Sequence, residues 1–172
     1  MPLFDIVLIG IIVGFTLFGF WFGFIHTLGS LVGTLLATYL ASRWYEAAAN
    51  WLMNITGWTG NFPKVLMFII LFLIINRLVG LLFFLVDRSL SIITKMPFIN
   101  SLNKLIGGVF GFIEGLVVLG ITIYFINKFP LGPGFMTALA NSKVAPYCVH
   151  ASSVLLPFVP EAIKQLKAAL NL

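Results

Sequence analysis

The chain has 172 residues, of which 60% are hydrophobic and only 9% carry a formal charge. A soluble domain has about 25% charged residues, so this composition excludes a soluble globular protein and indicates an integral membrane protein. The formal net charge is +5, but the ten Lys and Arg residues are scattered through apolar sequence and form no basic stripe. We therefore expect anionic lipid headgroups, and no nucleic acid, as their electrostatic partners.

The N-terminal quarter of the chain predicts two membrane-spanning helices. Between Asp5 and Arg43 it runs 37 residues without a formal charge. As one helix this stretch would be roughly 55 Å long, nearly twice the ~30 Å hydrocarbon core of a bilayer. We therefore expect two short spans, at about residues 3–22 and 24–42, folded back on each other. The fold point is expected at residues 19–23, because glycines loosen a helix and aromatic side chains suit the lipid–water boundary.

The segment after the second span predicts a short interfacial amphipathic helix. Its apolar side chains recur at helical spacing on one face, opposite Glu46 and Asn50, and they are Trp44, Ala48, Trp51 and Ile55. This pattern is typical of a helix that lies in the membrane surface. Two glycines and a proline in residues 56–63 then predict a loop.

Two further spans are predicted at about residues 65–85 and 105–126, with a polar connection between them. Prolines cut the later sequence into pieces shorter than the ~17 residues that are needed to cross a bilayer. We expect residues 129–172 to form an amphipathic tail on the membrane surface, with its last helix at about residues 160–170. The predicted fold is an all-α membrane protein, a four-transmembrane-helix bundle in residues 1–128 that starts with a helical hairpin.

Glycines form the strongest pattern, because many of them recur every four residues. They are Gly10 and Gly14, Gly19 and Gly23, Gly29 and Gly33, and Gly107, Gly111 and Gly115. Within a bilayer no hydrophobic effect drives helices together, so small residues act by letting backbones approach for van der Waals contact. We interpret these glycines as helix-packing positions, and the alternative is a glycine-lined path for a solute.

Arg77 and Glu114 are charged residues inside the third and fourth predicted spans. Counted inward from the polar connection, they lie at depths of about 12 and 14 Å if these spans are antiparallel neighbours. A lone charge at mid-membrane costs about 2.5–3.5 kcal/mol on insertion scales, and pairing would offset much of this. The hypothesis is an ion pair that faces the bundle interior. The alternatives are snorkelling side chains or misplaced span boundaries, and a site that handles protons or ions.

Other residues that could carry chemistry give weaker signals. His26 follows the hairpin bend, where a lone histidine is more often an interfacial polar group than a proton relay. His150 and the single cysteine, Cys148, have no neighbours in the sequence that suit a metal site, so we expect no metal and no cofactor. Residues 101–104 match a Ser-x-x-Lys string but lack the companion motifs of that hydrolase class, so we expect no enzymatic activity.

Four stretches match the pattern of a known family in the correct order. They are residues 4–6 (FDI); Gly19 and residues 23–25 (GFI), followed by Gly33 and Ala37; residues 102–115 (LNKLIGGVFGFIEG); and residues 141–146 (NSKVAP). Together they resemble the colicin V production protein family of small bacterial inner-membrane proteins. Two positions depart from it: members usually carry a basic residue just before the hairpin glycine, where this chain has Trp21 and Phe22, and they often have Arg or Lys in place of Glu114.

The resemblance implies four transmembrane helices in a bacterial cytoplasmic membrane, with a role in colicin export and envelope homeostasis. Some relatives carry this module ahead of an extracytoplasmic serine protease, which implies a scaffold that positions partners and has both termini outside. Charge counting leaves the orientation open, because four basic residues near the span ends lie on the terminal side and three on the other.

We therefore expect a non-enzymatic inner-membrane scaffold or accessory factor in colicin V production and export, a toxin biosynthetic process, and in envelope homeostasis. Its expected partners are membrane lipid and a membrane or envelope protein, and its glycine faces could also join copies into a homo-oligomer. The alternative is a small oligomeric transporter or channel that uses Arg77 and Glu114.

Overall fold

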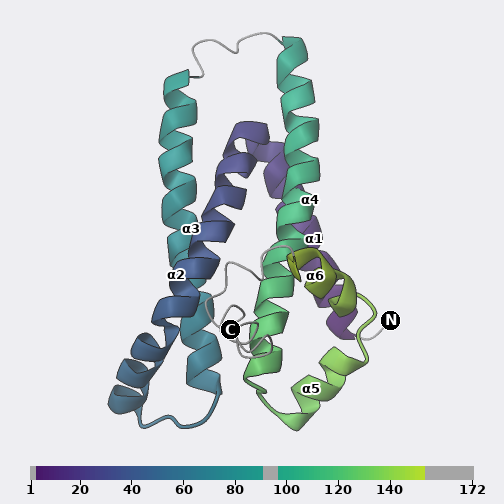
Figure 1. Ribbon diagram of the computed structural model, residues 1–172. Coiled ribbons are helices and arrows are strands. Elements are labelled where there is room, and N and C mark those ends of the chain that lie inside the picture. The colour runs from purple at the N-terminus through teal and green to yellow at the C-terminus, as the bar shows by residue number, and fades with distance from the viewer. Residues whose placement is uncertain (1–2, 91–96, 154–172) are drawn as a thin grey trace, which may run out of the picture.

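The computed structural model describes residues 3–90 and 97–153, and Figure 1 shows how they are arranged. In this part the chain forms α-helices and no strand: α1 (Leu3–Phe22), α2 (Phe24–Thr56), α3 (Phe62–Leu90), α4 (Pro97–Lys128), α5 (Pro133–Ala140) and α6 (Ala145–Ser152). The first four are long and apolar enough to cross a membrane. The predicted all-α bundle with four spans is therefore confirmed.

The initial hairpin bends at Gly23, but its two legs pack mainly on other helices. Gly23 has a φ of 83°, a left-handed conformation that glycine adopts without steric cost. Below this bend α1 packs along α4 and α2 packs along α3, whereas α1 and α2 share little contact. Figure 1 shows the two legs diverging from the bend. The expectation that the first two spans fold onto each other is therefore correct for the bend and incorrect for the packing.

The backbones of α1 and α4 meet at a crossing made of glycines. A Cβ added at Gly19 would overlap the backbone carbonyl of Gly107, and one at Gly111 would overlap the carbonyl of Phe15. A Cβ at Gly107 would overlap backbone atoms of both Gly19 and Gly23. Backbone atoms cannot rotate away as a side chain can, so this approach requires glycine on both helices.

Helix α4 also provides a cap for the start of α2. The side-chain oxygen of Asn103 accepts a hydrogen bond from the backbone N–H of Phe24 at 3.0 Å. The first N–H groups of a helix have no acceptor within it, so a side-chain oxygen from another helix can satisfy one of them. The bend is thereby held by α4 as well as by its own backbone.

The glycine stripe of α2 lies against α3. A Cβ at Gly29 would overlap the ring of Phe83, and one at Gly33 would overlap the side-chain oxygen of Asn76. Ala37 and Ala41 continue this stripe and are fully buried. Gly29 and Gly33, the helix-packing positions predicted in the second span, therefore lie in close helix contacts.

The remaining glycines of the predicted set fall into two groups. Gly115 continues the α1–α4 contact, since a Cβ there would lie 3.1 Å from the side chain of Phe15. At Gly10 and Gly14 a Cβ would meet no atom within 4 Å. Both are exposed and lie two residues, about 200° around the helix, from Ile12, which contacts Gly115, so they sit outside the close contact with α4. The packing role expected for Gly10 and Gly14 is not seen in this arrangement.

The interfacial helix expected after the second span is instead the end of α2, which runs 33 residues without a break. No glycine or proline interrupts it after Gly33, and it ends at Gly57, whose N–H donates to the carbonyl of Met53 at 2.9 Å. Trp44 and Trp51 lie exposed on its outer face. The predicted amphipathic face is present, but on a continuation of the span.

Aromatic side chains join α2, α3 and α4 away from the bend. The rings of Phe68 and Phe125 stack with centroids 3.9 Å apart, and Tyr45 meets Phe125 edge to face at 4.7 Å. Such ring contacts stabilise a packed core beyond their buried area. This cluster holds together the end of the bundle that the glycine crossing does not reach.

The tail returns to pack against α4. A Cβ at Gly120 would overlap the carbonyl of Cys148 and the hydroxyl of Ser152, so α6 lies directly on α4. Cys148 and Ser152 are buried there. This part of the expected surface tail therefore belongs to the bundle, and the helix predicted at residues 160–170 lies outside the described residues.

A hydrogen-bonded cluster, here called the Asp5 clamp, joins the start of α1 to the loop before α6. The fully buried carboxylate of Asp5 accepts hydrogen bonds from the hydroxyl of Ser142 at 2.5 Å and from the backbone N–H groups of Lys143 at 3.2 Å and Val144 at 3.4 Å. The Ser142 hydroxyl in turn accepts the N–H of Ala145 at 3.0 Å. Since a buried carboxylate requires such donors, this cluster fixes the tail to the first span.

The glycine crossing can be tested with Gly107→Ala. The new Cβ would overlap backbone atoms, so we expect a loss of about 1–3 kcal/mol of stability, as for other overpacked sites. The measurement is the thermal unfolding midpoint in mild detergent. Gly10→Ala is the control, because it gains the same helix propensity but adds its Cβ in open space. Equal midpoints for the two variants would contradict the crossing.

The Asp5 clamp can be tested through the buried thiol of Cys148. Asp5→Ala leaves the Ser142 hydroxyl and two N–H groups without their acceptor, so we expect α6 to open more often and maleimide to label Cys148 about tenfold faster. Burial raises the pKa of the Cys148 thiol, which slows labelling of the closed form. Glu46→Gln removes an exposed charge on α2 but keeps an acceptor for the Tyr45 hydroxyl, so it should leave the labelling rate unchanged. A wild-type rate in Asp5→Ala would rule the clamp out as a constraint on α6.

Candidate functional site

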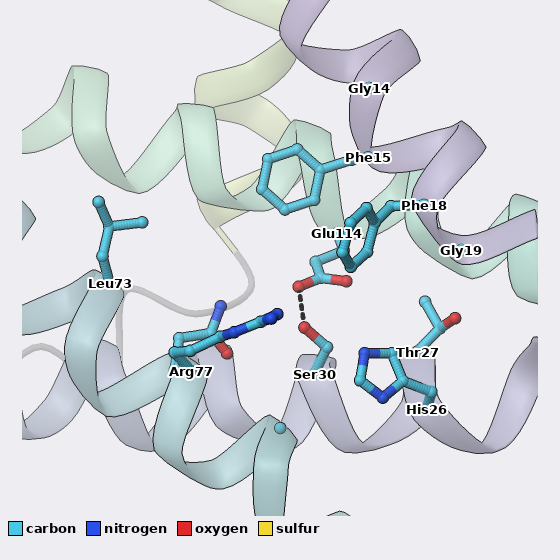
Figure 2. Close-up of a pocket in the computed structure, with 12 residues that line it drawn as sticks. Gly14, Phe15, Phe18, Gly19, His26, Thr27, Ser30, Leu73, Arg77 and Glu114 are labelled. Atoms are coloured by element: carbon cyan, nitrogen blue, oxygen red, sulfur yellow. Dashed lines mark hydrogen bonds between the residues drawn. The ribbon is translucent and has the colours of Figure 1, made fainter. Parts of the chain in front are cut away.

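A cavity of about 280 Å³ lies among the four long helices, and Figure 2 shows the side chains around it. Its polar lining residues are His26, Thr27, Ser30, Asn76, Arg77 and Glu114, and its other lining residues are Gly14, Phe15, Phe18, Gly19, Leu73 and Gly80. Helix α1 packs on α4 and α2 packs on α3, but α1 and α3 make almost no contact. The cavity therefore lies on the unfilled side of the bundle, between α1 and α3. It is therefore a polar site inside a membrane bundle.

Helical spacing brings the polar side chains of the cavity together from α2, α3 and α4. On α3, Leu73, Arg77 and Gly80 recur every three to four residues and so share one face. On α4, Glu114 adjoins the glycine face that contacts α1, and on α2, Ser30 adjoins Gly29. Glu114 and Ser30 therefore lie at the edges of the close glycine contacts, and these edges border the cavity.

Glu114 is held by polar partners from α2 and α3. Its side chain is only 4% exposed, and its carboxylate accepts a hydrogen bond from the hydroxyl of Ser30. Asn76 provides a second side-chain hydrogen bond to the same group. A carboxyl group in the membrane interior requires such partners, so these contacts account for its position.

Arg77 lies on the facing wall of the same cavity. Figure 2 shows its guanidinium group directed toward Ser30 and Glu114, while the residue as a whole is exposed. Among the described residues, no ion pair joins Arg77 to Glu114, whose acceptor atoms take hydrogen bonds from Ser30 and Asn76. The structure therefore brings the two predicted residues to one cavity, and the ion pair between them stays a prediction.

His26 joins the same group of residues. We expected an interfacial histidine from the sequence, but His26 lines the cavity, and the centroid of its ring lies 4.7 Å from that of Phe22. Ser30 and Asn76 were missed as site residues. The signal that could have found them is their polarity within otherwise apolar spans, since polar residues inside a membrane are costly and commonly functional.

The arrangement suits the binding of a polar group within the membrane. One wall offers the guanidinium of Arg77 and another offers the carboxyl of Glu114, with the apolar side chains of Phe15, Phe18 and Leu73 beside them. The cavity can therefore receive a group that needs both charge and apolar surroundings. The Ser-x-x-Lys string lies elsewhere, at the start of α4, where both Ser101 and Lys104 are exposed.

Comparison with protein families identifies a relationship across most of the chain. The family model described as colicin V production protein matches residues 4–153, which include the six helices, the cavity and the Asp5 clamp. Comparison with curated proteins and with solved structures gives no match. The chain therefore belongs to the colicin V production protein family, which supports a role in colicin V production for this multi-pass membrane protein.

Proposed function

We propose that the protein is a non-enzymatic scaffold or accessory factor of the bacterial inner membrane, with roles in colicin V production and export and in envelope homeostasis. The observation that carries this proposal is the unfilled side of the bundle between α1 and α3. There Phe18 of α1 and Leu73 of α3, both exposed apolar side chains, line a polar cavity. In a membrane, polar groups beside an apolar helix face promote association with another helix.

The internal contacts of the cavity favour a binding role over a catalytic one. The hydroxyl of Ser30 donates to Glu114, and Asn76 bonds to the same carboxyl group. These side chains thus hold one another in place and shape a surface that a membrane partner could cover. A second copy of the chain is one such partner, and another envelope protein is the one we favour.

Photo-crosslinking in cells that secrete colicin V tests this proposal. A photoreactive amino acid at Phe18 or Leu73 is expected to give the same crosslinked envelope protein from both positions, because both line the cavity on the unfilled side. Leu36, exposed on α2, is the matched control and should not give it. A product at twice the mass of the chain would indicate a homo-oligomer. Crosslinks of equal yield at all three positions would contradict a specific docking side.

A small transporter or channel is the second candidate, favoured by the presence of three titratable side chains, His26, Arg77 and Glu114, at one cavity inside the bundle. Such residues inside membranes commonly mark ion or proton paths. The scaffold proposal expects purified protein in liposomes to give no ion or proton flux above empty liposomes. Flux that Glu114→Gln abolishes and Glu46→Gln leaves intact would replace the scaffold with a transporter.

A further inference from the structure

The cavity presents two opposite charges on separate walls. Arg77 belongs to α3 and Glu114 to α4, and both line the same space. Glu114 has partners in Ser30 and Asn76, whereas Arg77 makes no ion pair with any described residue. An arginine carries five N–H donors, and inside a membrane those donors require an acceptor. The described residues supply no ion-pair partner for these donors, so an anionic group that enters the cavity would satisfy the guanidinium.

Such an acceptor would enter the cavity from the surrounding lipid. Leu73 and Phe18 border the cavity and are 53% and 47% exposed, and both belong to helices long and apolar enough to span a membrane. Glu114, at 4% exposed, lies deeper. A bound molecule would therefore place its polar part inward, beside both charges, and its hydrocarbon part outward between α1 and α3.

We propose that this cavity binds the headgroup of a zwitterionic phospholipid of the phosphoethanolamine class. The phosphate accepts hydrogen bonds from the guanidinium of Arg77, a pairing that suits arginine's planar set of donors. The ammonium group donates to the carboxyl of Glu114. The inference goes beyond the scaffold proposal and does not depend on it.

Charge and size both favour this class. The walls carry one positive and one negative group, so a headgroup with both charges satisfies each of them. A purely anionic headgroup would leave Glu114 facing a like charge, which disfavours binding. The volume of about 280 Å³ is close to the lower end of the roughly 300–1,000 Å³ of small-molecule pockets. It therefore suits a headgroup whose acyl chains stay in the bilayer.

Native mass spectrometry of the full chain in detergent tests the proposal. The probes are phosphatidylethanolamine and phosphatidylglycerol with identical acyl chains, added in equal amounts. We expect phosphatidylethanolamine to be retained about tenfold more than phosphatidylglycerol, and Glu114→Gln to reduce this ratio to about one. Arg77→Gln should lower the retention of both lipids, because both carry the phosphate.

Control variants separate recognition from folding. Arg43→Gln and Glu46→Gln remove the same charges from exposed positions on α2 and should leave the lipid ratio unchanged. Leu73→Trp adds bulk beside the cavity without removing either charge and should lower the retention of phosphatidylethanolamine. Circular dichroism and the thermal midpoint identify any variant that fails to fold. If a charge variant does not fold, Leu73→Trp still tests the site, because Leu73 is already half exposed and its replacement should not disturb the packing.

Three outcomes would overturn the proposal. Equal retention of the two lipids by the wild-type chain, or preference for phosphatidylglycerol, would exclude recognition of the ammonium group. A ratio that survives Glu114→Gln would place the recognition elsewhere. Binding of soluble glycerophosphoethanolamine without retention of the lipid would assign the site to a soluble ligand.

Discussion

The contact between the backbones of α1 and α4 is the constraint on which the arrangement of this protein depends. Gly19 meets Gly107 and Gly111 so closely that no Cβ fits between the helices. In a bilayer, where apolar side chains gain nothing by leaving lipid, such a contact is one of the few ways to hold two helices together. It commits α1 to α4 and leaves α2 free to pack along α3.

The cavity follows from that pairing. The bend at Gly23 joins two legs that then diverge, so the two helix pairs meet at the bend and again through α2 and α4, but α1 and α3 stay apart. Polar residues beside the glycine contacts, such as Ser30 and Glu114, therefore border an unfilled space. Their hydrogen bond spans 84 residues of sequence and shows that the polar interior is built by helix packing.

Family membership concerns the cellular role of the protein, whereas the cavity concerns the molecules that it can bind. Membership supports a role in colicin V production, while the geometry concerns what a single copy can contact in the membrane. A scaffold and a lipid-binding site are compatible, because a lipid headgroup between α1 and α3 would complete the surface that a partner helix meets. In both cases the charges of Arg77 and Glu114 have a reason to stay inside a span, where unpaired charges are costly.

The Asp5 clamp shows how two of the stretches that resemble the family come together. Asp5 and Ser142 lie 137 residues apart and share a hydrogen bond. In the sequence they were two separate matches, one at the start of the first span and one in the tail. Their meeting places α6 against α4 and explains why Cys148 and Ser152 are buried.

The sequence by itself determined the class of the protein and the number of its spans, because span length is a local property that can be compared with bilayer thickness. Four-residue spacing also identified the small-residue faces of α2 and α4, and counting depth from the polar connection brought Arg77 and Glu114 to one level. Only the tertiary structure decided that α1 pairs with α4, that Gly10 and Gly14 lie outside this contact, and that Ser30, Asn76 and His26 join the cavity. The physical reason is that an apolar helix face has nearly the same free energy against lipid as against another apolar helix. The choice of partner helix therefore depends on how well whole helix surfaces fit together.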